Sequence, residues 1–416
     1  MTSPTLLCQL LVEERKKKGL PVYNLGLGEN PLCPRNLPEF TFHPKARHYG
    51  KADGIQEFSD KIKKLYGRDP NDRVLFGHGL KEMVYLAQAS CKGTIIHVTP
   101  TWVSYYEQLS QLNKLDCLIE IETTRENGYQ ILPETLEKTL QGCQEEGEIL
   151  LLFNNPNNPT GICHSPEVVE RIAEVIRKFP NVVVFADDIY GEIVYDYSFG
   201  WKSISEYLPT QTIVGSSFSK NMGLGGYRCG WMIFPPTLED FYQRCYSKAS
   251  STYSCLSMPI QYFGSQLLDY MTEVDREGDE REDERGEGSR ETREITRWDS
   301  HLDDIRQVFK KNRDLVDSLL KTSKLKYVKP NCSWYFFVDF VEYSDKLKAH
   351  NLDTSQKIVQ WLARHGVICV AGSTFRNKEL TVRLSIVDFT IDDSYPEIAA
   401  KITTNIEALI KLVENL

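Results

Sequence analysis

Residues 212–231 have the sequence TIVGSSFSKNMGLGGYRCGW. A short apolar run at 212–215 leads into serines and then Lys220, and glycines and Arg228 follow. A lysine at a strand end, beside hydroxyls and an arginine, suits a phosphorylated carbonyl compound. Nearby positive charge and partial burial would lower the pKa of its amine and free it for attack. The alternative is a surface loop with an ordinary solvated lysine, and the rest of the chain decides against it.

Three further apolar runs, at 94–98, 149–153 and 182–186, also end on polar or aromatic clusters. These clusters are PTW at 100–102, NNPNNPTG at 154–161 and DDIY at 187–190. Amphipathic stretches separate the runs, which is typical of βαβ units around a parallel sheet. Because ligands bind outside the carboxyl ends of strands in such α/β sheets, the four segments predict one shared site.

The composition fits a large domain with a smaller one attached, since 416 residues are 41% apolar. No apolar run is long enough to span a bilayer. The apolar stretch 6–12 precedes the basic cluster 15–18, which is the reverse of a secretory signal. The 11 cysteines form no CxxC pair and favour reduced thiols in the cytoplasm over disulfides or a metal site. The net charge of −9 argues against nucleic acid as a partner.

Residues 273–300 hold 12 acidic residues and 6 arginines, and so carry most of the net charge. This low-complexity stretch cannot bury apolar surface, which predicts a solvated loop or helical spur, with a docking tail for a basic partner as the alternative. We expect a large domain at 46–270, an acidic insert at 271–300, and a small α+β domain formed by 1–45 together with 301–416.

The segment GHGLK at 77–81 follows the run 73–76 and opens an amphipathic helix at 82–90. A glycine turn into a helix presents free backbone N–H groups, which suit a phosphate. Alone this pattern indicates only a turn, and it supports a phosphate site only together with the other motifs.

Taken together, these motifs resemble the class I pyridoxal-phosphate aminotransferases of fold type I. The NPTG motif at 158–161, the pair Asp187 and Tyr190, and the segment 217–220 with Arg228 occur in family order and near family spacing. The resemblance covers nearly the whole chain apart from the acidic insert. It implies an α/β fold whose large domain holds a mostly parallel, seven-stranded sheet.

The resemblance implies that Lys220 forms a Schiff base with pyridoxal 5′-phosphate and then moves a proton between substrate and cofactor. Asp187 would keep the pyridine nitrogen protonated. Asn158 and Tyr190 would hydrogen-bond the phenolic oxygen. Trp102 would stack on the ring, with a core aromatic as the alternative. The phosphate would be held by Arg228, Ser217, Ser219 and the backbone of Gly79 and Leu80.

The family pattern also implies residues outside the cofactor ring. Tyr49 matches a tyrosine that reaches the phosphate of a neighbouring subunit, which implies a homodimer with shared sites. Arg383 matches the arginine that grips the substrate α-carboxylate, a role suited to a bidentate guanidinium, with an exposed strand residue as the alternative. Gly28 and Asn158 would border the same end of the substrate.

Lys81 and the segment WVSY at 102–105 resemble the prokaryotic-type aspartate aminotransferases, in which a lysine at this turn binds the distal carboxylate of the substrate. Thr5 falls at the position of a threonine that assists it. Such a lysine is a charge partner in a partly dry pocket, with a solvated first-turn residue as the alternative. Cys332 stands where the family often has glycine beside the substrate region, which puts the specificity in doubt.

Aspartate or glutamate, with 2-oxoglutarate or oxaloacetate, are therefore the expected substrates. An aromatic or broad-specificity aminotransferase, a carbon–sulfur β-lyase or an aminocyclopropane carboxylate synthase would share Lys220, Asp187 and Arg383. A non-catalytic ligand sensor of this fold usually carries a DNA-binding domain, and no helix-turn-helix segment precedes Thr5. The sequence thus predicts a cytoplasmic, homodimeric aminotransferase that acts on small molecules, without nucleic acid, membrane or metal.

Overall fold

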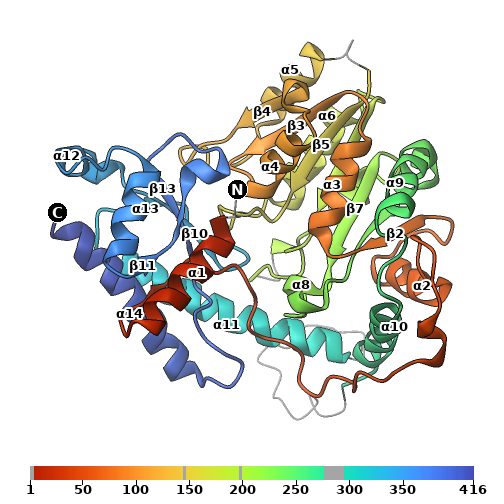
Figure 1. The fold of residues 1–416 in the computed structure, drawn as a ribbon. Coiled ribbons are helices and arrows are strands. Elements are labelled where there is room, and N and C mark those ends of the chain that lie inside the picture. Colours follow the sequence, from red (N-terminus) through yellow and green to blue (C-terminus); the bar gives the residue numbers. More distant parts are fainter. Residues whose placement is uncertain (1–3, 144–146, 196–198, 276–294) are drawn as a thin grey trace, which may run out of the picture.

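A seven-stranded sheet forms the larger part of the molecule, in the order β2-β8-β7-β6-β5-β3-β4 (Figure 1). The structure is a computed structural model that describes residues 4–143, 147–195, 199–275 and 295–416. The strands are β2 (Arg73–Gly77), β3 (Thr94–Thr99), β4 (Leu118–Glu122), β5 (Ile149–Asn154), β6 (Val182–Asp187), β7 (Thr212–Ser217) and β8 (Gly230–Phe234). Within this sheet β8 runs antiparallel to both of its neighbours, β2 and β7, and all other neighbouring strands are parallel. The predicted α/β class and the mostly parallel seven-stranded sheet are confirmed.

Helices cover both faces of this sheet, which is why its inner strands are mostly apolar and almost fully buried. On β5, Leu150 and Leu152 belong to one apolar cluster, and Leu151 and Phe153 belong to another. The first cluster includes side chains of α3 (Leu80–Ser90), α4 (Val103–Gln111) and α9 (Glu239–Thr252). The second includes side chains of α5 (Pro133–Gly142), α6 (Pro166–Ile176) and α7 (Ile204–Tyr207).

A four-stranded antiparallel sheet, in the order β12-β13-β10-β9, forms the smaller part. Its strands are β9 (Lys326–Tyr327), β10 (Tyr335–Asp339), β12 (Val370–Ala371) and β13 (Thr381–Ser385). The N-terminal segment joins this part through the parallel pair β1 (Tyr23–Asn24) and β11 (Val367–Ile368). The helices of this part are α1 (Pro4–Lys17), α11 (Arg297–Leu320), α12 (Ser344–Ala349), α13 (Ser355–Arg364) and α14 (Tyr395–Glu414). The remaining helices are α2 (Gln56–Leu65), α8 (Phe218–Asn221) and α10 (Met258–Thr272).

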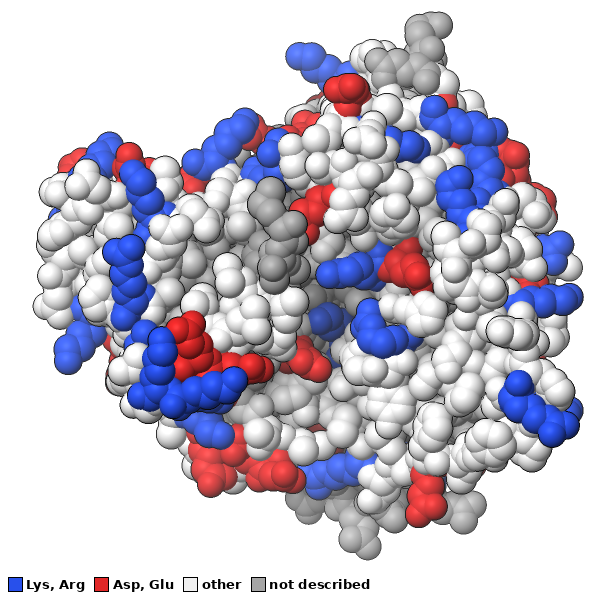
Figure 2. Space-filling model, in the orientation of Figure 1, with Lys and Arg blue, Asp and Glu red and all other residues white. Residues whose placement is uncertain are grey.

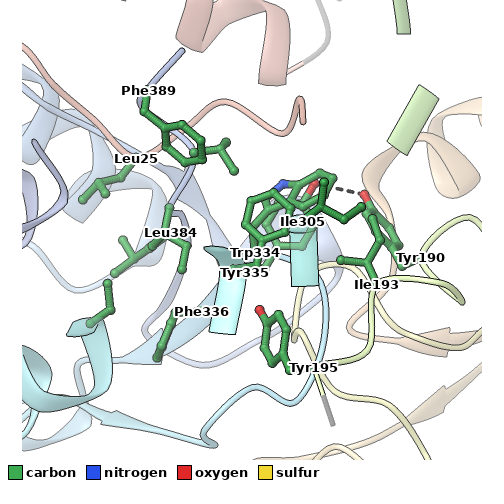
Figure 3. Close-up of a cluster of buried hydrophobic side chains, with 14 of the residues drawn as sticks. Leu25, Tyr190, Ile193, Tyr195, Ile305, Trp334, Tyr335, Phe336, Leu384 and Phe389 are labelled. Atoms are coloured by element: carbon green, nitrogen blue, oxygen red, sulfur yellow. Dashed lines mark hydrogen bonds between the residues drawn. The ribbon is translucent and has the colours of Figure 1, made fainter. Parts of the chain in front are cut away.

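The largest apolar cluster joins the two parts (Figure 3). Phe218 at the start of α8 and Trp231 of β8 reach it from the larger part. Trp334, just before β10, and Phe336 of β10 reach it from the smaller part. Burying one large apolar side chain contributes about 1.5–3 kcal/mol, so this shared core stabilises one arrangement of the two sheets. The domain boundaries predicted from the sequence stay a prediction.

The four runs predicted as strands are β3, β5, β6 and β7, each one or two residues longer at its carboxyl end than expected. The added residues include Asn154, Asp187 and Ser217. Most of the acidic insert (276–294) lies outside the described residues. No helix in the described part of the chain is long and apolar enough to cross a membrane.

Candidate active site

A cavity of about 710 Å³ lies at the carboxyl ends of the large-sheet strands, beside β10 and β13 of the small sheet. Figure 2 shows a hollow in the middle of this face, with lysine and arginine atoms gathered in it. The lining includes these residues predicted from the sequence: Gly28, Leu80, Lys81, Trp102, Asn158, Asp187, Tyr190, Ser217, Ser219, Lys220, Arg228 and Arg383. The structure thus brings these residues together in one cavity at the predicted sheet edge.

Lys220 sits on α8, a single helical turn that follows β7. Ser217 caps this turn, since its hydroxyl accepts a hydrogen bond from the Ser219 N–H at 3.2 Å. The Lys220 amine donates to the backbone carbonyl of Gly28. Its nitrogen lies 5.7 Å from the ring centre of Trp334. The amine is thus held at the cavity wall by groups from the N-terminal segment and from the residue just before β10.

Asp187 is the last residue of β6 and is only 3% exposed. The Tyr105 hydroxyl donates to one carboxylate oxygen, and the Ile189 N–H donates to the other at 3.3 Å. Burial raises the pKa of Asp187 to about 6, while these hydrogen bonds and the charge of Lys220 lower it. A cationic group placed against this carboxylate would favour its charged form. The neighbouring Asp188 is also buried but does not line the cavity.

An anion cradle surrounds the start of α3. Gly79 caps this helix with a φ of +90°, a conformation that favours glycine, and a Cβ there would collide with the guanidinium of Arg228. Arg228 donates to the carbonyls of His78 (2.7 Å) and Gly225 (2.8 Å). A Cβ at Gly230 would come within 2.5 Å of the backbone of Leu80.

Free N–H groups of a helix start, a guanidinium and two serine hydroxyls converge here. This donor set fits a phosphate group.

Arg383 lies on β13 and is 1% exposed, which excludes the alternative of an exposed strand residue. It donates to the Asn158 side-chain oxygen at 3.0 Å and to the Gly26 carbonyl at 3.1 Å. Its guanidinium carbon lies 4.5 Å from the ring centre of Tyr335. No ion pair with a carboxylate was found for it in the described part of the chain. A buried cation that faces a cavity and has no acidic partner is suited to bind the carboxylate of a ligand.

Lys81 lies at the mouth of the cavity, with its nitrogen 5.1 Å from the ring centre of Trp102. Much of its side chain is open to solvent, yet surrounding protein atoms desolvate the ammonium and lower its pKa. Glu107 opposes this effect, whereas the charges of Arg228 and Lys220 lower the pKa further. Such an ammonium gains from an anionic ligand, because the ligand offsets the lost hydration.

Three predicted residues are not placed in this cavity by the structure. Gly79 does not line it, although it lies against Arg228 and directly precedes Leu80, which both do. Tyr49 is 96% exposed and does not line the cavity of its own chain. Thr5 belongs to α1, but its side chain lies outside the described residues. Their roles stay predictions.

The structure also shows contributors that the sequence analysis does not assign. Tyr105 binds Asp187, and Asn154 links the backbone of Asn158 and Asp187 with hydrogen bonds of 2.9 and 3.0 Å. Leu6 and Gln9 of α1 and Tyr335 of β10 line the cavity. Only Tyr105 and Asn154 carried a sequence signal, since both stand within clusters at the predicted sheet edge.

A cavity-facing lysine after β7, a buried carboxylate at the end of β6 and an anion cradle at the start of α3 define a pyridoxal-phosphate enzyme of fold type I. The family model for aminotransferases of class I and II matches residues 22–394, and the chain belongs to this family. It is therefore a pyridoxal-phosphate-dependent aminotransferase.

Individual relatives are similar over nearly their whole length. The asparagine–oxo-acid transaminase of Streptococcus mutans is 27% identical over 399 residues, which cover 92% of this chain and 91% of the relative. An aspartate aminotransferase of Sulfolobus acidocaldarius is 24% identical over 421 residues, covering 94% and 91%. The solved aspartate aminotransferase of Thermus thermophilus with maleate matches with a TM-score of 0.78 at 20% identity, covering 99% of this chain and 97% of that one.

Proposed function

We propose that this aminotransferase moves amino groups between aspartate or glutamate and the corresponding 2-oxo acids. The observation that carries this proposal is that two basic residues with different surroundings, Arg383 and Lys81, line one cavity together with Lys220. Arg383 is buried and offers a planar guanidinium, while Lys81 stands at the mouth. A dicarboxylic substrate has one carboxylate for each of them. Relatives named aspartate aminotransferases support the same reading.

The cofactor site that we propose uses groups on four strand ends and one helix start. Arg228, Ser217 and Ser219, with the N–H of Leu80, bind the phosphate. Asp187 pairs with the ring nitrogen. The further contacts are made by Trp102, which covers the ring, and by Asn158 and Tyr190, which face the phenolic oxygen. When bound, pyridoxal phosphate supplies a ring that accepts the electrons of the bond broken at the substrate α-carbon.

Lys220 is the residue that we assign to proton transfer at that α-carbon. Its amine already lies in the cavity beside Gly28 and above Trp334, so it can act on the substrate without a change of fold. Arg383 holds the α-carboxylate and so fixes which bond of the substrate faces the amine. Asp187 stays ionised when the cationic ring nitrogen is beside it.

Asparagine is a second candidate amino donor. Gln9 lines the cavity from α1, and an amide can both donate to and accept from the side-chain amide of asparagine. The relative from Streptococcus mutans is named for this substrate. A neutral donor would depend less on the charge of Lys81 than an acidic donor would.

We also propose a cytoplasmic homodimer. Tyr49, Phe42 and Phe40 are exposed on one N-terminal segment, with exposures of 96%, 72% and 50%. Exposed aromatic side chains of this kind are typical of surfaces that are covered by a partner. A second copy of the chain would cover them and would bring Tyr49 toward the phosphate site of its neighbour. The 11 cysteines, without a disulfide among the described residues, support the cytoplasm.

The test begins with the cofactor. Purified protein should absorb visible light, and borohydride reduction should attach the cofactor to the peptide that contains Lys220. Lys220→Ala should lower transamination by at least about a hundred- to ten-thousand-fold, because the group that moves the proton is gone. Attachment to another lysine would refute the assignment.

A panel of donors then separates the substrates. Aspartate, glutamate, asparagine and phenylalanine should be offered with 2-oxoglutarate and with pyruvate, and the 2-oxo acid product measured. We expect the highest kcat/KM for the acidic donors. A higher value for phenylalanine would contradict the proposal, and a higher value for asparagine would favour the second candidate.

A further inference from the structure

Tyr335 is a buried tyrosine of β10 whose hydroxyl lies 3.0 Å from the hydroxyl of Tyr190. Figure 3 shows this hydrogen bond beside the ring of Trp334. Both tyrosines line the cavity, and they come from different parts of the molecule. The pair therefore links the large sheet to the small one at the site itself.

The direction of this hydrogen bond follows from the single proton of each phenol. Burial raises the pKa of Tyr190 well above its usual value, so its hydroxyl keeps its proton at neutral pH. When Tyr190 donates this proton to the phenolic oxygen of the cofactor, its own oxygen can only accept, and Tyr335 becomes the donor. Hydrogen bonds in such a chain polarise and strengthen one another.

The ring of Tyr335 makes a second contact. The guanidinium of Arg383 lies 4.5 Å from its centre, and a Cβ at Gly28 would come within 2.7 Å of its hydroxyl. Tyr335 thus touches Tyr190 with its hydroxyl and Arg383 with its ring face. One side chain contacts a residue on the cofactor side and a residue on the substrate side.

We propose that Tyr335 is a positioning residue for both neighbours: its hydroxyl orients the Tyr190 phenol toward the cofactor, and its ring holds the Arg383 guanidinium in place for the substrate carboxylate. This inference rests on the roles of Tyr190 and Arg383 in the proposed function. Two variants separate the two contacts, because Tyr335→Phe removes only the hydroxyl, whereas Tyr335→Leu also removes the ring.

The first measurement is the pH at which the visible absorption of the holoenzyme changes. This midpoint reports the proton held between the Lys220 nitrogen and the phenolic oxygen of the cofactor. Tyr335→Phe weakens the hydrogen bond from Tyr190 to that oxygen. The proton between the Lys220 nitrogen and the oxygen is then held more tightly. The midpoint should rise by about half to one pH unit.

Tyr195→Phe is the matched control. Tyr195 is buried in the same apolar cluster, its hydroxyl donates to the Ser333 carbonyl, and it does not line the cavity. Loss of the Tyr195 hydroxyl should leave the pH midpoint of the absorption change where it is in the wild type. The double variant Tyr190→Phe/Tyr335→Phe should show the same midpoint as Tyr190→Phe alone, because the Tyr335 hydroxyl acts only through Tyr190.

The second measurement separates KM from kcat. Tyr335→Phe keeps the ring, so KM for aspartate and for alanine should stay within about twofold of the wild type, while kcat falls. Tyr335→Leu should raise KM for both substrates by about tenfold, since both carry the α-carboxylate. Should Tyr335→Leu fail to fold, Tyr335→Trp replaces it: a larger ring displaces Arg383 and should raise KM for both substrates alike.

The outcomes distinguish the inference from the proposed function. A wild-type protein without visible absorption would refute the function. Normal absorption with an unmoved midpoint in Tyr335→Phe would overturn the role of the hydroxyl and leave the function standing. An equal shift in Tyr195→Phe, or an additive shift in the double variant, would overturn it too. An unchanged KM in the variant that alters the ring would overturn the role of the ring.

Discussion

Arg383 and Lys81 are cations of one cavity whose surroundings differ, and this difference leads to a prediction at the scale of single residues. Arg383 is buried against Tyr335, whereas Lys81 is open to solvent at the mouth. Lys81→Ala should lower kcat/KM for aspartate and glutamate by about ten- to a hundredfold, since a charge-assisted contact contributes about 1.5–3 kcal/mol. The values of kcat/KM for alanine and phenylalanine should stay unchanged.

Arg383→Ala is the contrasting variant, and the measurement is kcat/KM for each donor. This variant should lower kcat/KM for every substrate, because all of them carry the α-carboxylate. Lys92→Ala, at an exposed lysine outside the cavity, serves as the control and should change neither value. If Lys81→Ala harms acidic and aromatic donors alike, then Lys81 belongs to the phosphate site instead.

The adjacent carboxylates Asp187 and Asp188 lead to a prediction about pH. Burial raises the pKa of Asp188 to about 7, well above the unfolded value of about 3.9. The folded chain then keeps a proton that the unfolded chain releases, so the free energy of unfolding falls as the pH rises from about 4 to about 7.

Asp188→Asn removes the free-energy cost of ionising this buried carboxyl group. It should raise the free energy of unfolding at pH 8 by up to about 3–4 kcal/mol and change it little at pH 4. Thermal melts of the cofactor-free protein at both pH values measure this. Activity should survive in Asp188→Asn and be lost in Asp187→Asn, since only Asp187 lines the cavity. Equal losses of activity would show that the two roles are misassigned.

Helix α8 shows how one short element depends on its neighbours. A four-residue helix has almost no stability of its own. Asn30 donates to the Lys220 carbonyl at 2.7 Å, and the Asn221 side chain donates to the half-buried carboxylate of Glu192. Glu192 also accepts from the Trp298 indole of α11 at 2.9 Å. The turn that carries the amine is therefore anchored to three distant segments.

Asn221→Ala tests this anchor. It leaves the half-buried Glu192 carboxylate with one donor fewer, and desolvation already raises the pKa of Glu192. We expect a loss of about 1–3 kcal/mol in the free energy of unfolding, with a lower kcat and little change in KM. Thermal melts and steady-state kinetics measure both. Asn181→Ala is the control, because Asn181 is half-buried, donates to the Gly147 carbonyl and does not line the cavity. A melt unchanged from the wild type would contradict the anchoring role.

At the same scale, the sequence predicts the strands better than the contacts between them. Short apolar runs that end on turn-forming residues predict β3, β5, β6 and β7 to within one or two residues, because strands covered on both faces are mostly apolar. The α1 helix is also predicted. Its buried residues are Cys8 and Val12, however, whereas the leucines at 6, 7 and 10 are exposed. Which face packs depends on segments more than 300 residues away.

The same limit applies to the site. Lys220, Asp187 and Arg228 follow from motifs within short stretches of sequence. The contact of Tyr190 with Tyr335 joins residues 145 positions apart, and no local pattern reports it. All five residues of β10 are buried, so alternation of polar and apolar residues does not show which side chain faces the cavity. Contacts of this kind follow from the packing of the two sheets.

At the scale of the whole molecule, the cavity of one chain is formed by its two sheets and its N-terminal segment, while Tyr49 is exposed and does not line it. If Tyr49 completes the phosphate site of a second copy, then neither copy has a complete site alone. Tyr49→Phe should weaken cofactor binding by about tenfold or more, since it removes a hydrogen bond to a charged phosphate. Equilibrium titration of the cofactor measures this loss.

Mixing two impaired chains then tests which subunit supplies the tyrosine. One chain carries Lys220→Ala and the other Tyr49→Phe, and the cofactor is kept at a concentration that fills only complete sites. In a mixed dimer with shared sites, both lesions fall in one site, and the other site has an intact Lys220 and an intact Tyr49. Because random exchange makes half of the dimers mixed, activity should return to about a quarter of the wild-type value. If Tyr49 served its own chain, every site would hold one lesion and no activity would return. A fully active monomer at the assay concentration would contradict the shared site as well.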